Sequence, residues 1–214
     1  MTTLGPYDLN TIITGDAREL AKAIPDESVD LIFTDPVYDR IEDYRWLAET
    51  AARVLKPGGN CAAYQAHVFY PETFQALGKH LTYRWILTEQ KIGTQSSIFG
   101  RRVLCRTKHI LLYCRPPIGK KWVVDYTDKY PGSNINHKWG KGNSALYWLK
   151  QFETSVILDP FAGGGSLISA CKMLQRNYLA FEIDPDTADM ARKRVAETQP
   201  PLPIVYHEQM ELLT

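Results

Sequence analysis

The stretch ILDPFAGGGS at residues 157–166 decides the fold prediction. In this stretch the end of an apolar strand is followed by three glycines, and a helix is predicted from Gly165 to Leu174. Glycines let the backbone turn sharply and let a ligand approach it closely, and a helix start adds unpaired N–H donors. The turn has neither the GxGxxG pattern of dinucleotide sites nor the GxxxxGK[ST] pattern of a P-loop. The sequence therefore predicts a site for a different ligand.

An acidic residue follows this turn at the spacing expected of a ribose-binding carboxylate. Glu182 directly follows the next predicted strand, Tyr178 to Phe181. A carboxylate about 20 positions after the glycines, at the end of the second strand, can accept hydrogen bonds from ribose hydroxyls. The combination predicts a ligand that contains a nucleoside.

A second turn, far upstream, has the same relation to a strand. Asp35-Pro36-Val37-Tyr38 follows the apolar run VDLIFT at residues 29–34. Residues that follow a strand of an open α/β sheet lie at the edge where such sheets bind ligands. A carboxylate, a backbone carbonyl and an aromatic ring meet there, which makes Asp35, Pro36 and Tyr38 candidates for a reactive site.

Strands and helices alternate at both ends of the chain, which predicts a mostly parallel α/β sheet with helices on both faces. Residues 116–143 are rich in Pro, Gly, Asn and Lys and read as loops. We therefore expect one domain over residues 1–214, divided into 1–115, a loop-rich insertion at 116–143, and 144–214. The predicted strands are 11–14, 29–34, 60–65, 81–91, 109–114, 155–158 and 178–181, and the predicted helices are 17–24, 44–55, 71–80, 144–152, 165–174 and 185–197.

Length and composition narrow the class of protein. The chain has 214 residues, of which 44% are hydrophobic and 23% charged, a balance that excludes a disordered chain. No run approaches the ~18 apolar residues of a membrane span, and the N-terminal residues do not resemble a signal peptide. Four scattered cysteines without a CxxC pair predict neither a zinc site nor a disulfide framework. These features together favour the cytoplasm.

Positive charge is concentrated in the middle of the chain. Residues 79–150 hold 14 Lys and Arg against 3 Asp and Glu. Aromatic residues such as Trp85, Tyr113 and Trp139 lie among these charges, a pattern that favours binding of nucleic acid. The loop at residues 120–138 is expected to contact the nucleic acid and recognise its target sequence. The candidate nucleic-acid-binding residues are Arg101, Arg102, Arg106, Lys108, Lys120, Lys121 and Lys138.

Together these motifs resemble those of amino-directed DNA methyltransferases. Residues 35–38 are similar to the Asp-Pro-Pro-Tyr catalytic motif of that family, and residues 159–166 to its S-adenosylmethionine motif. The catalytic motif comes first and the cofactor motif last, which is the order of the circularly permuted β class. Residues 15–17, 106–115, 137–141 and 182–184 resemble further segments of the class. Val37 departs from the pattern, because it stands in place of the second proline.

The resemblance implies a Rossmann-like fold, S-adenosylmethionine as cofactor, S-adenosylhomocysteine as its product and a base flipped out of duplex DNA. Asp35 and the Pro36 carbonyl would accept the hydrogens of the target amine, while Tyr38 would stack on the base. Asp16 would accept a hydrogen bond from the amino group of the cofactor adenine. The remaining candidate cofactor residues are Asp159, Phe161, Gly163, Gly165, Ser166, Glu182, Lys141 and Ser144.

Several functions fit these residues. Asp at the first motif position favours N6 of adenine, with N4 of cytosine as the close alternative, because both amines need the same acceptors. Methylation of RNA and a catalytically silent DNA-binding protein are further alternatives. We expect duplex DNA as partner, no membrane and no metal. A homodimer and a separate restriction endonuclease are additional partners to be considered.

Overall fold

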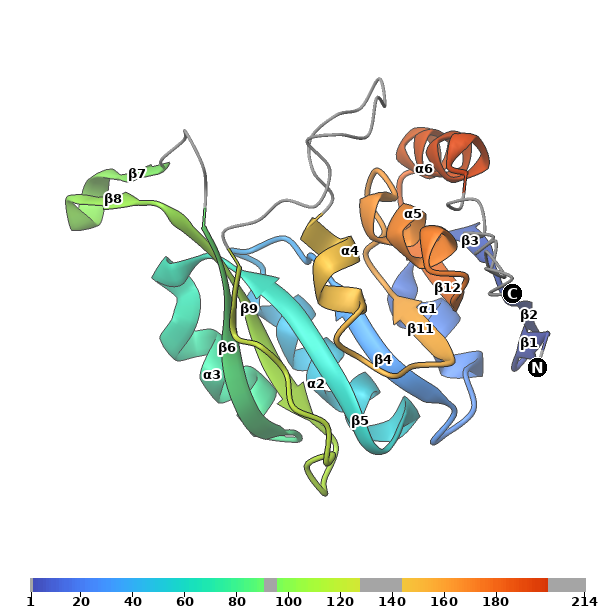
Figure 1. Cartoon of the computed structure of the whole chain (residues 1–214), viewed down its shortest axis with the longest axis horizontal. Helices are drawn as coiled ribbons and strands as arrows, with labels where there is room; N and C mark the ends of the chain where they lie inside the picture. Colours follow the sequence, from blue (N-terminus) through green and yellow to red (C-terminus); the bar gives the residue numbers. More distant parts are fainter. Residues whose placement is uncertain (1, 91–95, 128–143, 200–214) are drawn as a thin grey trace, which may run out of the picture.

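The computed structural model describes residues 2–90, 96–127 and 144–199. Its centre is an eight-stranded sheet in the order β10-β6-β9-β5-β4-β11-β12-β3 (Figure 1). Only β9 runs antiparallel to its neighbours β5 and β6, and all other pairs are parallel. Its strands are β3 (Thr11–Thr14), β4 (Val29–Thr34), β5 (Leu55–Gln65), β6 (Thr82–Gln90), β9 (Thr107–Cys114), β10 (Tyr126–Thr127), β11 (Val156–Asp159) and β12 (Asn177–Glu182).

Helices cover both faces of this sheet, which confirms the predicted α/β class (Figure 1). One apolar cluster joins one face to α1 (Ala17–Leu20), η1 (Ala21–Ala23), α2 (Ile41–Val54) and α3 (Tyr70–Gly78). A second cluster joins the other face to α4 (Ser144–Leu149), α5 (Ser166–Met173) and α6 (Pro185–Glu197). The central strands are apolar on both sides for this reason, and Leu31, Ile32 and Phe33 of β4 are completely buried.

Smaller elements lie outside the large sheet. A two-stranded ribbon at the N-terminus pairs β1 (Thr3–Leu4) with β2 (Tyr7–Asp8). A hairpin of β7 (Ser96–Ile98) and β8 (Val103–Cys105), with η3 (Phe99–Arg101) between them, extends away from the body (Figure 1). The short η2 (His67–Phe69) precedes α3.

Several features differ from the sequence prediction. Strand β10 lies in the stretch predicted as loops and pairs with β6, and the β1–β2 ribbon was not predicted. Strand β5 begins at Leu55, five residues before the predicted start, because residues 56–59 continue the chain in an extended bulge beside β4. The amide of Gly58 donates to the Arg115 carbonyl across this bulge. The β7–β8 hairpin was not predicted, since Arg101, Arg102 and Gly100 interrupt its short apolar strands.

No helix among the described residues is long and apolar enough to cross a membrane. Residues 128–143, most of the predicted insertion, lie outside the described part of the chain. The division into 1–115, 116–143 and 144–214 therefore stays a prediction, although strands from both ends of the chain share one sheet.

Candidate active site

The two predicted motifs meet at one edge of the sheet. Strands β5, β4, β11, β12 and β3 are parallel neighbours, so their carboxyl ends lie side by side. Asp35 follows β4, and the glycine-rich turn follows β11. Glu182 ends β12, and Asp16 comes just after β3. Residues that are more than 100 positions apart in the sequence are thereby brought to one place.

The Asp35 carboxylate is half-exposed and has two partners. Its Oδ2 accepts a hydrogen bond from Lys108 Nζ at 3.0 Å. Tyr38 lies next to it: burial, followed by the charge of Asp35 and a hydrogen bond to it, raises the pKa of Tyr38. The Tyr38 hydroxyl is therefore protonated at neutral pH and directed at Asp35.

The turn that carries these residues is closed without a second proline. Pro36 is buried, whereas Val37 is 53% exposed. The amide of Arg40 donates to the Val37 carbonyl at 3.1 Å. Val37 thus points to solvent, and the backbone hydrogen bond keeps the turn compact.

The glycine-rich turn needs its glycines at two positions. Gly163 and Gly165 have φ angles of +49° and +74°, in the left-handed region that favours glycine. A Cβ at Gly163 would meet open space, whereas a Cβ at Gly165 would lie 2.9 Å from the Ala191 Cβ of α6. Gly163 therefore keeps the turn open toward a ligand, and Gly165 permits close packing of the turn on α6.

Glu182 links the turn to the next helix and still has acceptor capacity. Its Oε2 accepts from the Gly163 amide at 2.8 Å and its Oε1 from the Asp184 amide at 3.0 Å. A carboxylate offers about four acceptor positions, so two bonds fix its orientation and leave room for hydroxyl donors. Its main-chain carbonyl accepts from Gly15, which places the adjacent Asp16 beside it. Asp16 caps α1 through a 2.8 Å bond from Arg18 N.

These contacts fit an adenosine-containing group. The turn offers an approachable backbone at Gly163, and Glu182 and Asp16 offer carboxylate oxygens for hydroxyl and amino donors. Phe161 adds an apolar surface, supported edge-on by Trp46 of α2 at a ring distance of 5.7 Å. The residues present are therefore those that a nucleoside cofactor needs.

Asp159 departs from its predicted role as a cofactor ligand. It is buried, and its Oδ1 accepts from the Thr34 hydroxyl at 2.7 Å and from the Phe161 amide at 3.2 Å. Burial, opposed by these two bonds, raises the pKa of Asp159 to about 7. Its carboxylate joins β11 to β4 instead of facing the open edge, because the donors that satisfy it lie inside the sheet.

Comparisons with known proteins agree with this geometry. A family model described as "DNA methylase" matches residues 149–193, and one described as "Methyltransferase domain" matches residues 3–63. The type II methyltransferases M.BamHI of Bacillus amyloliquefaciens and M.HinfI of Haemophilus influenzae are each 26% identical, over 83% and 90% of this chain. The chain is similar to type II DNA methyltransferases over most of its length. The predicted resemblance is confirmed.

The chain spans 56% of the length of M.BamHI and 70% of the length of M.HinfI. It covers 92% of the putative methylase YubD of Escherichia coli K12, at 26% identity. Among solved structures, the complex of M1.HpyAVI with SAM has a TM-score of 0.67 at 23% identity, covering 86% of this chain and 98% of that one. The cytosine-N4-specific PvuII DNA methyltransferase has a TM-score of 0.72 at 13% identity, covering 91% and 87%. These structures share the fold.

A buried polar group at the candidate site was missed by sequence reasoning. Glu89 of β6 is buried, and its Oε1 accepts from the Tyr64 hydroxyl and from Trp148 Nε1, both at 2.6 Å. The Tyr64 hydroxyl is also 3.4 Å from Ser144 Oγ, at the start of α4. The signal available in the sequence was an isolated acidic residue in the basic segment.

The remaining candidate residues fall into three groups. Ser144 and Ser166 begin α4 and α5, the two helices that follow the insertion and the glycine-rich turn. Arg101, Arg102 and Arg106 are exposed on or beside the β7–β8 hairpin, as a DNA contact requires. Lys138 and Lys141 lie outside the described residues.

Two predicted DNA-binding lysines have partners within the protein. Lys108 lies against Asp35, and Lys121 forms an ion pair with Glu153 at 2.7 Å. Lys120, in contrast, is exposed. The assignment of Lys108 to DNA stays a prediction, and in this structure its ammonium faces Asp35.

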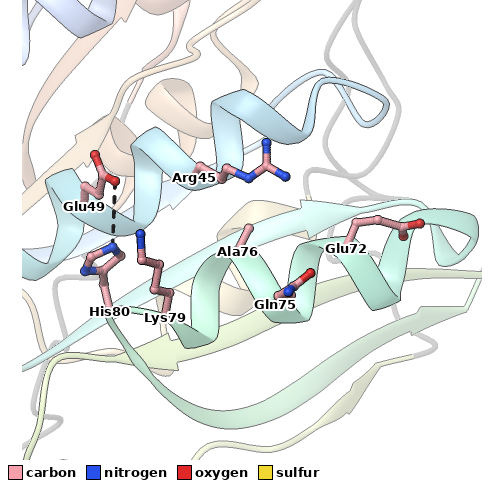
Figure 2. A pocket seen from close by; sticks show the side chains of 7 residues that line it. All are labelled: Arg45, Glu49, Glu72, Gln75, Ala76, Lys79 and His80. Atoms are coloured by element: carbon pink, nitrogen blue, oxygen red, sulfur yellow. Dashed lines mark ion pairs between the residues drawn. The ribbon is translucent and has the colours of Figure 1, made fainter.

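A hollow elsewhere on the protein carries none of the predicted residues. It lies between α2 and α3, where Glu49 and His80 point toward one another, 3.8 Å apart (Figure 2). Its lining residues are Arg45, Glu49, Glu72, Gln75, Ala76, Lys79 and His80. Within the described ranges, no group of three His, Cys, Asp or Glu residues could hold a metal ion.

Proposed function

We propose that this protein methylates N6 of adenine in duplex DNA, with S-adenosylmethionine as methyl donor. The observation that carries the proposal is the placement of Asp35 and Glu182 at one edge of the sheet, at the ends of strands separated by β11 alone. An acceptor for an amine and a holder for a nucleoside thus face the same space.

Asp35 and the Pro36 carbonyl would act on the target amine. The lone pair of an aromatic amine is delocalised into the ring, which makes the nitrogen a poor nucleophile. Two acceptors that each take one N–H favour a more tetrahedral nitrogen. Positive charge builds on this nitrogen during attack, so the acceptors stabilise the transition state more than the ground state.

Residues on the cofactor side would bind and orient S-adenosylmethionine. The turn at 161–165 would hold the methionine portion, Glu182 the ribose and Asp16 the adenine amino group. Bound S-adenosylmethionine supplies an electrophilic methyl group on a sulfonium. The amine nitrogen forms the new carbon–nitrogen bond as the carbon–sulfur bond breaks, and the methylated amine then releases one proton.

The target base must leave the helix to reach Asp35. Stacking on an aromatic ring is worth about 1–3 kcal/mol per base and would offset part of the unstacking cost. Tyr38 would provide that ring, and its bond to Asp35 would hold it in place. The exposed arginines of the β7–β8 hairpin would contact the DNA around the flipped base. We also propose that the protein acts in the cytoplasm.

Asp at the first motif position favours adenine over cytosine. The test is transfer of labelled methyl from S-adenosylmethionine to unmethylated duplex DNA, followed by identification of the labelled nucleoside. Label in N6-methyladenine supports the proposal. N4-methylcytosine alone would replace adenine by cytosine, and label in RNA but not in DNA would change the substrate class.

A further inference from the structure

Lys108 is held from two sides at the candidate catalytic carboxylate. Its Nζ is 3.0 Å from Asp35 Oδ2 and 3.6 Å from the centroid of the Tyr64 ring. The face of an aromatic ring is electron-rich and attracts a cation at this distance. A carboxylate and a ring face therefore form a site for positive charge.

The surroundings of Tyr64 strengthen this site. The Tyr64 hydroxyl donates to the buried carboxylate of Glu89, which also accepts from Trp148 Nε1. These bonds fix the ring and its orientation. Phe33 stacks against the Tyr64 ring at a centroid distance of 5.8 Å. The ring is thus a rigid wall, and the Glu89 charge behind it favours a cation in front.

The reaction under "Proposed function" produces a cation at the same carboxylate. The target amine approaches Asp35 as a neutral nitrogen donor and becomes positively charged as it is methylated. The Lys108 ammonium is a nitrogen donor already bound to Asp35 Oδ2. The Lys108 ammonium is therefore similar, in charge and in its bond to Asp35, to the amine nitrogen that the carboxylate has to stabilise.

We propose that the Lys108 ammonium occupies the site of the target amine in the DNA-free protein, and that the flipped base displaces it from Asp35. This inference rests on the proposed methyltransferase activity. The Lys108 ammonium balances the negative charge of Asp35 until a base binds. Only a group that hydrogen-bonds to Asp35 in its place can enter the site.

The pair is suited to exchange. The side chains of Lys108 and Asp35 are 33% and 46% exposed, so water reaches both. Ion pairs with this exposure are weak, and the lysine stem is flexible. Stacking of a base on an aromatic ring is generally worth more than an exposed ion pair, so a base that also donates to Asp35 can displace the lysine.

The test uses single-turnover methylation of duplex DNA with the protein in excess, so that product release does not affect the rate. In Lys108→Met, which keeps the apolar stem, we expect the half-saturating protein concentration to fall about fivefold. The maximal rate should stay within about twofold, because Asp35 and Pro36 are untouched. Lys108→Arg, which keeps the cation, should restore the wild-type value.

Lys193→Met is the matched control for loss of one lysine charge, since Lys193 is exposed on α6 and has no part in the site. It should leave both values unchanged. If Lys108→Met does not fold, as judged by its melting curve, Lys108→Gln replaces it in the same experiment.

Other results would overturn the inference. An unchanged or higher half-saturating concentration in Lys108→Met would exclude competition for Asp35. A tenfold fall in maximal rate would make Lys108 a positioning residue for Asp35, and a changed Kd for S-adenosylmethionine would place it in the cofactor site. Absence of transfer by the wild-type protein would instead reject the proposed function, so the two failures are distinct.

Discussion

The Thr34 hydroxyl donates a 2.7 Å hydrogen bond to Asp159 Oδ1, and both groups are buried. Thr34 is the last residue of β4, directly before Asp35, and Asp159 is the last residue of β11, directly before the glycine-rich turn. One bond therefore joins the origins of the two motifs, 125 residues apart in sequence. It fixes the position of Asp35 relative to the glycine-rich turn.

Ionisation of Asp159 is expected to lower stability. Burial raises its pKa from the ordinary value of 3.8 to about 7, so the folded state keeps a proton that the unfolded state loses. The stabilising contribution is present below about pH 4 and is lost as pH rises through about 7. Asp159→Asn removes this loss, so its gain in free energy of unfolding over wild type should be about 2 kcal/mol larger at pH 8 than at pH 5.

Melting temperatures at pH 5 and pH 8 check this prediction. Asp8→Asn, the same change at an exposed carboxylate, serves as control and should show no such difference. A gain in Asp159→Asn that is no larger at pH 8 than at pH 5 would contradict it. The same variant tests the corrected role, because its Kd for S-adenosylmethionine should stay within about threefold of wild type if only polar contacts inside the sheet are affected.

Asp35→Ala should separate catalysis from cofactor binding. Removing a group that stabilises developing charge costs about 10²–10³-fold in rate, whereas the cofactor residues lie on other strands. We expect transfer to fall by that factor and the Kd for S-adenosylmethionine to stay near wild type. Asp39→Ala, an exposed carboxylate four residues later, is the matched control. Transfer within a few-fold of wild type in Asp35→Ala would reject the role of Asp35.

The sequence predicts the strands that have strong local signals. VDLIFT at 29–34 and the helix at 185–197 have their predicted bounds, because an apolar run and a proline–aspartate start define them locally. The positions of Lys108 and Asp159 could not be predicted. Their side chains are placed by partners 73 and 125 residues away, and no local pattern records such pairing. Tyr64 and Glu89 belong to the site for the same reason.

Gly165 should tolerate no side chain. An added Cβ would lie 2.9 Å from Ala191 Cβ and 3.0 Å from Ala191 Cα, in a left-handed backbone conformation. Gly165→Ala should therefore lower the free energy of unfolding by about 1–3 kcal/mol. Gly164→Ala is the control, since its nearest neighbour would be a flexible Arg194 nitrogen at 3.5 Å. Equal denaturant midpoints for the two variants would contradict the packing argument.

His109 should make the protein sensitive to acid. Burial, followed by the charge of nearby His67, lowers the pKa of His109 from 6.5 to about 4. Its neutral ring bonds to the Tyr70 hydroxyl. The folded state therefore binds fewer protons, and the contribution of His109 to stability is lost as pH falls from about 6.5 to about 4.

His109→Gln should reduce this acid-induced loss by about 1 kcal/mol, a value discounted for partial exposure. Denaturant unfolding at pH 7 and pH 4.5 measures it as the difference between variant and wild type. His80→Gln is the control, because His80 lies at a helix end beside Glu49 (Figure 2) and has no buried imidazole neighbour among the residues drawn. An identical loss in wild type and His109→Gln would reject the assignment.

The β7–β8 hairpin should carry part of the affinity for DNA. Arg101 and Arg102 are exposed on an arm that extends from the body, and Arg106 is exposed just after it (Figure 1). Each lost phosphate contact makes the dependence of log affinity on log salt shallower by about one. Arg101→Gln combined with Arg102→Gln should therefore reduce the slope by about two.

The control is Arg45→Gln. Arg45 is an exposed arginine paired with Glu42 on α2, and its loss should leave the slope unchanged because that pair lies outside the proposed DNA contacts. Equal slopes for the double variant and wild type would remove the hairpin from the DNA interface.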